Sequence, residues 1–378
     1  MRKYLTVILV LLCFIGFPSV VFAQTESEIE NLLKDLIAEL DLSAIENLLS
    51  NNFNYKDIKE IIYSAITGEF VDFNELVTKI LISLKDGVAP ITKTFLTVFS
   101  VIIICGIFSA LKPDVGQLND LIFIFCYCVV AIVVFSECSK CINDTIGVIE
   151  GINKQIEGFF PVLLTLSSIA GAKNSTFAYG QIFSIASNGV LKVLTIVLIP
   201  IINLCAVLSL VSSLSEKFSL KKANEFFKDL FKWIIGAIIT VFSLFSFVKG
   251  ITAGSYDNFS IRTLKYAMGS SFPLLGGFAK DGIDVVVASS ILIKNAVGSV
   301  GIIALFYVIL TPFLQILLLS LLLKFLSGIC EPIADARICQ LINSFSKVLT
   351  MLASVLLMVF IIYFITFLVV ITTQNSLI

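Results

Sequence analysis

Residues 348–371 read VLTMLASVLLMVFIIYFITFLVVI, a stretch without a charged side chain. About 20 consecutive apolar residues are enough for a helix to cross the hydrocarbon core of a bilayer. Five further apolar runs precede this one, at residues 95–111, 121–135, 190–210, 233–248 and 302–323. The sequence therefore predicts an all-α, polytopic helical membrane protein with about six spans.

The composition of the whole chain also favours lipid as its solvent. Apolar residues make up 58% of the 378 residues and charged residues 14%, whereas soluble domains run at about 45–50% and about 25%. The net charge of -1 gives no electrostatic reason to bind nucleic acid. Histidine is absent, which excludes Ser-His-Asp catalysis and His-ligated zinc, and no P-loop, nucleophile elbow or dinucleotide motif occurs. We therefore expect a protein that is not an enzyme, without a cofactor or a metal site.

Residues 1–23 have the order of a signal peptide: Arg2 and Lys3, an apolar run, Pro18, and the small residue Ala23 before the expected cleavage point. The alternative is an uncleaved anchor, because the apolar stretch is almost long enough to span. Both interpretations place the residues that follow outside the cytoplasm.

Residues 24–90 are the part of the chain that looks soluble, with 13 acidic and 5 basic side chains. Apolar residues recur there at helical spacing, which predicts several short amphipathic helices. These helices form either a cap packed on the membrane domain or a docking surface for another extracytoplasmic protein. Residues 91–378 are the predicted polytopic membrane domain.

The charges of two connections set the predicted orientation. The connection at 214–232 is rich in lysine, and the connection at 136–158 is acidic. Positively charged loops stay in the cytoplasm, so the first connection is expected inside and the second outside. This orientation agrees with an exported N-terminal segment.

Two apolar stretches, 159–188 and 272–298, are interrupted by proline, glycine and charged residues. We expect each to be a re-entrant hairpin of two short helices, because broken backbone at membrane depth needs protein or water around it. Each stretch holds a Phe-Pro pair at or near its start, and the two pairs are 112 residues apart: Phe160-Pro161 and Phe272-Pro273.

The same spacing relates Pro200 to Pro312, and each proline precedes an amide by three residues, Asn203 or Gln315. These amides are expected to bond backbone carbonyls that the prolines free, or a neighbouring helix. The matching order of elements predicts an internal repeat, as known from transporters. The predicted units are residues 121–232 and 233–343.

Ionisable side chains in or beside the interrupted stretches define a candidate polar pathway: Lys192, Lys280, Asp281, Asp284 and Lys294. Ionisable groups at membrane depth suggest such a pathway. The alternative is that the second hairpin lies at the interface, where its side chains simply reach water. Cys138 and Cys141 have redox-motif spacing without a supporting β-α-β pattern, so we expect an occasional disulfide or none.

In this order of features the chain resembles the stage III sporulation protein AE family of endospore-forming Firmicutes. The resemblance rests on the signal peptide, the acidic helical segment and the phenylalanine-rich membrane domain with its paired Phe-Pro hairpins. It implies a mother-cell membrane protein that faces the forespore and belongs to a multiprotein channel assembly bridging the two membranes. The implied partners are other small membrane proteins, a secretion-type ATPase and ring-forming bitopic proteins. The resemblance implies no catalytic residue.

Two functions are compatible with these features. The first is a non-enzymatic, membrane-embedded subunit of a sporulation channel or secretion-like complex. The second is a stand-alone secondary transporter or permease, in which the candidate polar pathway would carry the substrate. A homo-oligomer is compatible with either function.

Overall fold

The computed structural model describes residues 73–110, 116–214, 220–271 and 276–372, together with residue 62 and residues 64–66. The described part of the chain is helical, which confirms the predicted all-α class. Its elements, in chain order, are α5 (Phe73–Ala110), α6 (Gly116–Ile169), α7 (Lys173–Ser184), η1 (Ile185–Val190), α8 (Leu191–Val193), η2 (Leu194–Leu198), α9 (Ile199–Leu214), α10 (Lys221–Ser271), α11 (Gly276–Cys330) and α12 (Ala336–Thr372).

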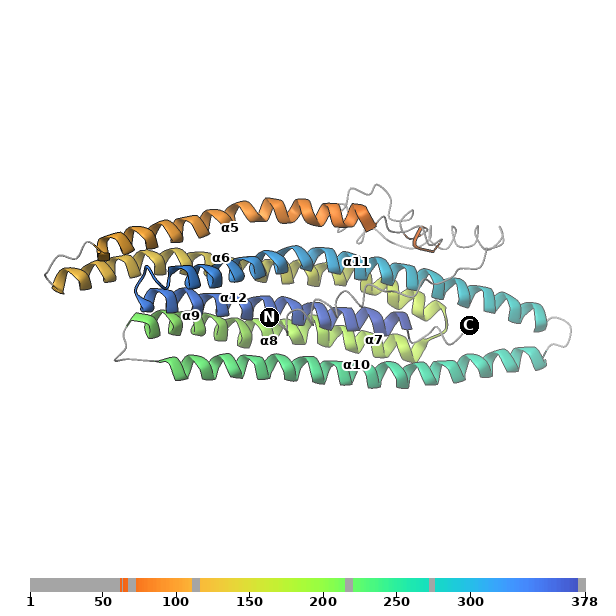
Figure 1. The fold of residues 1–378 in the computed structure, drawn as a ribbon. Helices are drawn as coiled ribbons and strands as arrows, with labels where there is room; N and C mark the ends of the chain where they lie inside the picture. Colours follow the sequence, from red (N-terminus) through yellow and green to blue (C-terminus); the bar gives the residue numbers. More distant parts are fainter. Residues whose placement is uncertain are drawn as a thin grey trace.

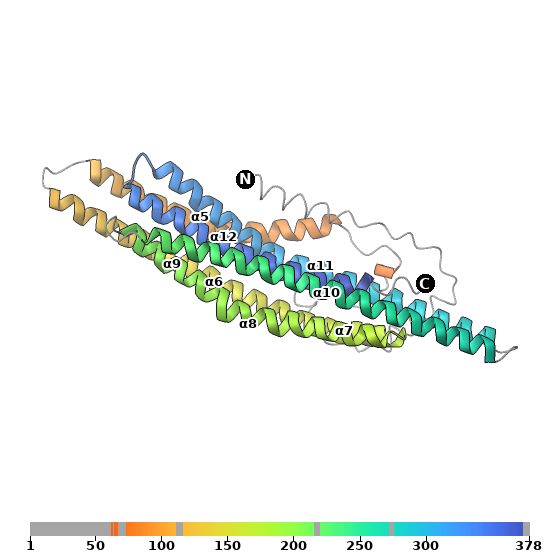
Figure 2. The ribbon, with the colours of Figure 1, turned by 90° about the horizontal axis from the view of Figure 1, so that it is seen from below.

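These elements form long rods that run alternately up and down an elongated bundle (Figures 1 and 2). The elements from α7 to α9 make one such rod, because the residues at the junctions of η1, α8 and η2 keep helical backbone angles. A tight turn at residues 170–172 joins α6 to α7, and Gly171 adopts a φ of 81° there, which favours glycine. Lipid offers no hydrogen-bond partner to backbone N–H and C=O groups. These groups must therefore bond within their own helix, which explains why the apolar segments are helical.

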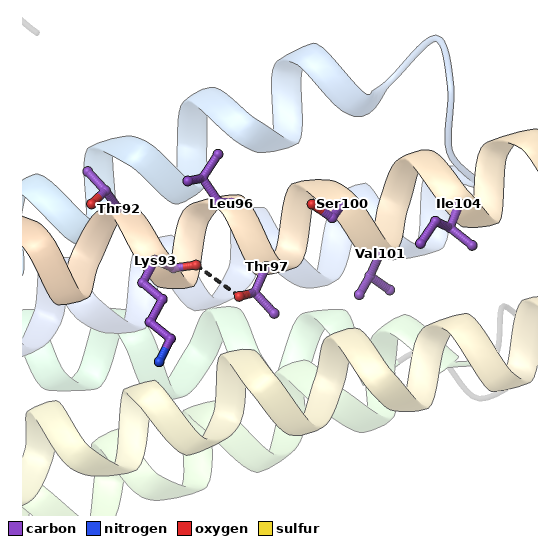
Figure 3. A pocket seen from close by; sticks show the side chains of 7 residues that line it. All are labelled: Thr92, Lys93, Leu96, Thr97, Ser100, Val101 and Ile104. Carbon is purple, nitrogen blue, oxygen red and sulfur yellow. Dashed lines mark hydrogen bonds between the residues drawn. The ribbon is translucent and has the colours of Figure 1, made fainter.

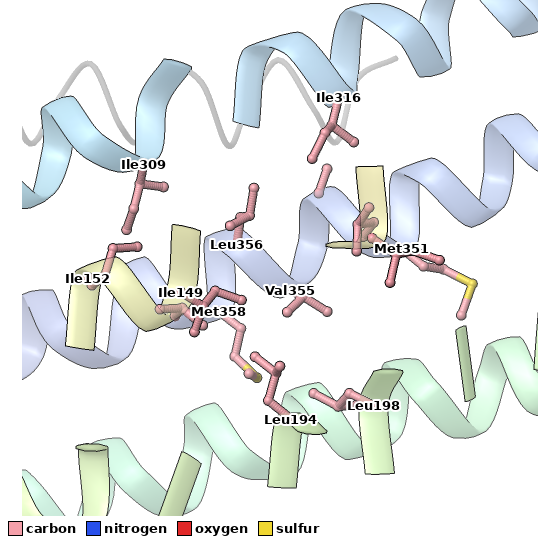
Figure 4. Packing of buried hydrophobic residues seen from close by; sticks show 14 of the residues in the cluster. Ile149, Ile152, Leu194, Leu198, Ile309, Ile316, Met351, Val355, Leu356 and Met358 are labelled. Atoms are coloured by element: carbon pink, nitrogen blue, oxygen red, sulfur yellow. The ribbon is translucent and has the colours of Figure 1, made fainter. Parts of the chain in front are cut away.

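Helix α12 lies at the centre of the bundle, where it contacts α6, α9, α10 and α11. Figure 4 shows the resulting core, in which Leu356 and Met358 of α12 lie among Ile152 of α6, Leu194 of η2 and Ile309 of α11. Leu352, Leu356 and Val359 are fully buried. Helix α12 has apolar residues on nearly every side, which is the pattern of a helix surrounded by others.

The rods are longer than a bilayer is thick. Asn224 of α10 bonds Ser209 of α9, and Asp257, 33 residues further along α10, bonds the start of α7. At 1.5 Å per residue these two contacts lie about 50 Å apart, whereas the hydrocarbon core is about 30 Å thick. Part of the bundle therefore extends beyond the hydrocarbon core. We call the end at residues 170–172 the outer end and the end at residues 331–335 the inner end.

The apolar runs predicted as separate spans are parts of these longer helices. In the described residues, five helices are long and apolar enough to cross a membrane: Phe123–Ile169, Lys173–Leu214, Lys221–Asp257, Asp284–Cys330 and Ala336–Thr372. The first predicted run, at 95–111, corresponds to the shorter apolar stretch Ile91–Ile104 within α5. The predicted count of about six spans and the internal repeat stay predictions.

The first interrupted stretch does form a helical hairpin, but its arms are not separate short helices. Its first arm is the end of α6, which continues without a break through Pro161, and its second arm begins the α7–α9 rod. The charged residues between 136 and 158 do not interrupt α6, which is one helix over its whole length. The described part of the second stretch, residues 276–298, belongs to the single helix α11 and forms no hairpin of its own, while Phe272 and Pro273 lie outside the described residues.

The predicted signal peptide and most of the acidic segment lie outside the described residues. Ile62 and Ile66 belong to the main buried cluster, so this part of the acidic segment packs on the bundle. Helix α5 runs through residue 90 without a break, so the end of the acidic segment and the first apolar run share one helix.

Candidate functional site

Asp257 of α10 holds the outer end of the bundle together. Its carboxylate is buried and accepts hydrogen bonds from the backbone N–H of Asn174 at 3.0 Å, from the Asn174 side-chain amide at 3.1 Å and from the backbone N–H of Ser175 at 2.6 Å. Both backbone groups lie in the first turn of α7, where a helix has no acceptor of its own for them. A carboxylate at this position also interacts favourably with the positive end of the helix dipole. We call this contact the outer clasp.

Two of the predicted pathway residues lie near the outer end on α11. Lys294 is fully buried and Asp284 is half-buried, and both have interactions within the protein. Close packing continues along this helix, because a β-carbon added at Gly301 would lie 2.5 Å from Cε1 of Phe367. Lys280 and Asp281 belong to the first turns of α11, and their side chains lie outside the description.

The fifth predicted pathway residue, Lys192, lies apart from Lys294. It is exposed on α8, between the two π-helical segments η1 and η2. π-helical turns inside an α-helical rod occur frequently at functional sites. Pro200 and Asn203 are exposed further along the same rod. The described residues therefore do not gather Lys192 and Lys294 around one cavity.

The second predicted amide faces a neighbouring helix. Gln315 of α11 lies against Gly87 of α5, where an added β-carbon would lie 2.0 Å from the Gln315 side-chain nitrogen. Glycine therefore lets α5 approach the amide closely. Pro312 lies inside α11, one turn before Gln315.

The Phe160-Pro161 pair is part of the core at the outer end. Phe160 is buried and stacks on Phe183 of α7 with ring centroids 4.1 Å apart. The neighbouring Phe159 makes an edge contact with Phe367 of α12 at 6.1 Å. Pro161 is exposed, and its carbonyl accepts a hydrogen bond from Thr165. These contacts assign the pair a packing role.

Contacts between α6 and α12 establish which residues lie at the same height along the bundle. The Tyr363 hydroxyl donates to Asn153 at 2.8 Å, and these residues are 210 apart in sequence. Phe345 and Phe135 make an edge contact and are separated by the same number of residues. The two helices run parallel, so the apolar run 348–371 of α12 lies level with about residues 138–161 of α6. Ser320 of α11 bonds Ser346 at 2.8 Å, which places the apolar run 302–323 at a similar height. We call this height the apolar belt.

Helix α6 carries charge at the height of the apolar belt. Its exposed residues there recur at helical spacing and form what we call the α6 stripe: Lys140, Asp144, Gly147, Glu150, Lys154 and Glu157. Glu150 lies level with about residue 360, near the middle of the α12 run. A charged residue at the centre of a lipid-facing helix costs roughly 2.5–3.5 kcal/mol. The α6 stripe is therefore an unfavourable surface for lipid.

Helix α10 differs from α6 in the side chains that it exposes at the height of the apolar belt. Between its contacts with Ser209 and Ser175, α10 runs alongside the α7–α9 rod, and that rod lies beside α6. At this height α10 exposes large apolar side chains, among them Trp233 at 79%, Val241 at 66% and Leu244 at 61%. Helix α10 lies across the bundle from α6 (Figures 1 and 2). The belt is thus apolar on the α10 side and charged on the α6 side.

A groove on α5 adjoins the charged side towards the inner end. Its volume is about 530 Å³, and Figure 3 shows the residues that line it: Thr92, Lys93, Leu96, Thr97, Ser100, Val101 and Ile104. Lys93 extends from α5 toward α6 (Figure 3). The α5 groove therefore holds hydroxyl groups and one ammonium group among Leu96, Val101 and Ile104, and most of its lining is apolar. Contacts from Gly87 to Gln315 and from Gly106 to Ile333 place the groove level with the last part of α11.

The inner end is fixed by polar contacts between α11 and α12. The Ser320 hydroxyl also lies 2.9 Å from the Thr350 hydroxyl, and Ser327 donates to the Cys339 carbonyl at 2.8 Å. At the start of α12, Arg337 donates to both oxygens of Asp335, the residue before the helix, at 3.1 and 3.0 Å. These hydrogen bonds lower the pKa of the Asp335 carboxyl below its usual value.

The described residues contain no cluster of three or more acidic or cysteine side chains that could hold a metal ion. Cys138 and Cys141 are free thiols, the first buried and the second half-buried. The outer clasp and the α6 stripe were not among the predicted sites. The sequence does carry a pattern that indicates the α6 stripe, because its charged residues recur at intervals of three, four and six. It carries no pattern that indicates the outer clasp, because the clasp joins residues that are 82 and 83 apart.

Comparisons with known proteins find similarity along most of the chain. A model of the stage III sporulation protein AE family matches residues 56–374. The chain is 26% identical, over 282 residues, to Stage III sporulation protein AE of Bacillus subtilis (strain 168). That alignment covers 74% of this chain and 70% of the Bacillus protein. No solved structure matches the chain.

Proposed function

Because the chain belongs to the stage III sporulation protein AE family, we propose that it is a membrane-embedded, non-enzymatic subunit of a channel or secretion-like complex that links mother cell and forespore. The observation that carries this proposal is the length of the rods. Helices α6, α10 and α11 have 54, 51 and 55 residues, which corresponds to about 75–85 Å. They exceed the hydrocarbon core by roughly 45–55 Å.

The orientation follows from the charges. The lysine-rich connection before α10 belongs on the cytoplasmic side of the mother-cell membrane. The outer end, with the α6–α7 and α10–α11 hairpins, then projects away from that cytoplasm, toward the forespore. Residues 24–90 are exported on the same side after the signal peptide. Two surfaces are then available to extracytoplasmic partners, the acidic segment and the outer end.

The proposed partners are other membrane proteins of the same sporulation stage, a secretion-type ATPase and ring-forming bitopic proteins. The test is affinity isolation of the tagged full chain from sporulating cells after mild detergent extraction, with the bound proteins identified by mass spectrometry. We expect these partners to be enriched over a control isolation with an unrelated multi-pass protein carrying the same tag. Recovery of the chain only as a free homo-oligomer would refute the proposal.

A stand-alone transporter is less well supported by the placement of its candidate residues. That function needs a polar pathway through one copy of the chain. Lys192 is exposed on α8 and Lys294 is buried on α11, while α12 fills the centre of the bundle. Polar groups gather instead on the outside of the bundle, along α6 and α5.

A further inference from the structure

We propose that the α6 stripe faces water within the apolar belt and forms one wall of a hydrophilic conduit along the side of the bundle. The inference rests on the proposed function in one respect, because neighbouring subunits supply the remaining walls. The conduit would admit water and small polar solutes.

The first argument is the contrast between two faces at one height. Glu150 is exposed on α6 near the middle of the belt, while Val241 and Leu244 are exposed at the same height on α10, across the bundle. One planar bilayer cannot be a good solvent for both faces, because lipid favours the α10 face and water the α6 face. An uneven environment, with lipid on one side and water on the other, satisfies both.

The second argument is the periodicity of α6 itself. The charged residues occupy one side of the helix, and the other side is apolar and buried, as Ile149, Ile152 and Ile156 show. The stripe is therefore a sustained face rather than a single misplaced charge. It is anchored to the core, because Asn153 donates to Glu157 at 2.7 Å and accepts from Tyr363 of the central helix.

The charges of the stripe indicate which solutes it would suit. The stripe contributes carboxylates from Asp144, Glu150 and Glu157 and ammonium groups from Lys140 and Lys154. This mixture of signs favours no single ion charge, so the conduit suits small polar solutes of either sign.

The test compares the reactivity of single cysteines introduced into the full chain in membranes from sporulating cells. Maleimide reacts with the thiolate, which forms in water but not in lipid. We expect E150C and D144C to react at least about tenfold faster than L244C and V241C, the matched variants on α10. I152C on the buried side of α6 should react slowly, and the unsubstituted chain gives the background from its own cysteines.

Each result decides the proposal. Equal, fast labelling at Glu150 and Leu244 would place both faces in bulk water and overturn it. Slow labelling at both Glu150 and Asp144, in variants that reach the membrane in normal amounts, would also overturn it, because protein or lipid then covers the stripe. Isolation of the partner complex is a separate measurement. A chain that co-purifies with its partners but labels evenly keeps the proposed function and loses the conduit.

Discussion

Replacing Asp257 with alanine is expected to release the start of α7 from α10. The carboxylate accepts two backbone N–H groups and one side-chain amide, and it is 1% exposed. A hydrogen bond to a charged group contributes about 1.5–3 kcal/mol. Because the freed N–H groups lie near the outer end and regain water, we expect a net loss of about 3 kcal/mol for the clasp rather than the sum of three bonds.

Hydrogen exchange at the backbone amides of Asn174 and Ser175 measures this loss directly. Each 1.4 kcal/mol corresponds to a factor of ten, so D257A should speed exchange of these amides by roughly 100-fold. The D257N variant keeps one carbonyl oxygen as an acceptor but loses the charge, and its effect should be about tenfold. Mass spectrometry of a peptide spanning residues 170–178, with the protein in lipid nanodiscs, would report both changes.

The matched control is D229A on the same helix. Asp229 pairs with Lys232 at 2.7 Å, but both side chains are well exposed, so this pair contributes little. The D229A substitution should therefore leave hydrogen exchange at the backbone amides of Asn174 and Ser175 unchanged. If D257A also leaves those amides as slow as in the wild type, the carboxylate is not what protects them, and the clasp has no role in holding the outer end.

Three further predictions concern packing and the inner end. Ser320→Ala removes the hydroxyl that joins α11 to α12 and should lower the free energy of unfolding by about 0.6–2 kcal/mol. The measurement is the melting temperature in detergent. The control is Ser299→Ala, which loses only a bond within its own helix, and an equally small effect of the two substitutions would contradict the prediction. Gly301→Ala drives a β-carbon into the buried Phe367 ring and should destabilise by about 1–3 kcal/mol, whereas Gly236→Ala meets nothing within 4 Å and should be neutral or stabilising. The hydrogen bonds from Arg337 lower the pKa of Asp335, so this pair stabilises the protein above the usual carboxyl pKa and loses its effect as the pH falls through the lowered value. Melting curves of D335N and wild type should therefore differ slightly at pH 7 and coincide in acid, and a difference that grows in acid would reverse the sign.

The membrane class and the approximate positions of the spans could be predicted because hydropathy is a local property. The run at 348–371 needs no tertiary information to be recognised as a helix that crosses lipid. The continuity of the rods was harder to predict. Charged residues between 136 and 158 were assigned to a connection, since the expected spans were about 20 residues long. In the structure the same residues are an uninterrupted part of α6, level with the apolar run of α12.

Some features of the candidate sites could likewise be predicted from the sequence, and others could not. Lys294 was recognised as unusual from its apolar surroundings, and the structure buries it. Its separation from Lys192 depends on which faces the two helices turn to the bundle, and composition carries no such information. The outer clasp depends on the register of α10 against α7, so it becomes visible only when both helices are placed. The α6 stripe depends on height relative to α12, which is also a property of the assembled bundle.

The central position of α12 has a consequence for synthesis. Ribosomes make this helix after α6, α9, α10 and α11, the four helices with which it makes most of its contacts. Those four must wait in the bilayer with the surfaces that will face α12 still unpaired, and the core can close only when residues 336–372 have been inserted. Closure of the core therefore depends on the insertion of α12, and membrane chaperones or early-arriving partner proteins have the interval before it in which to act on the other helices.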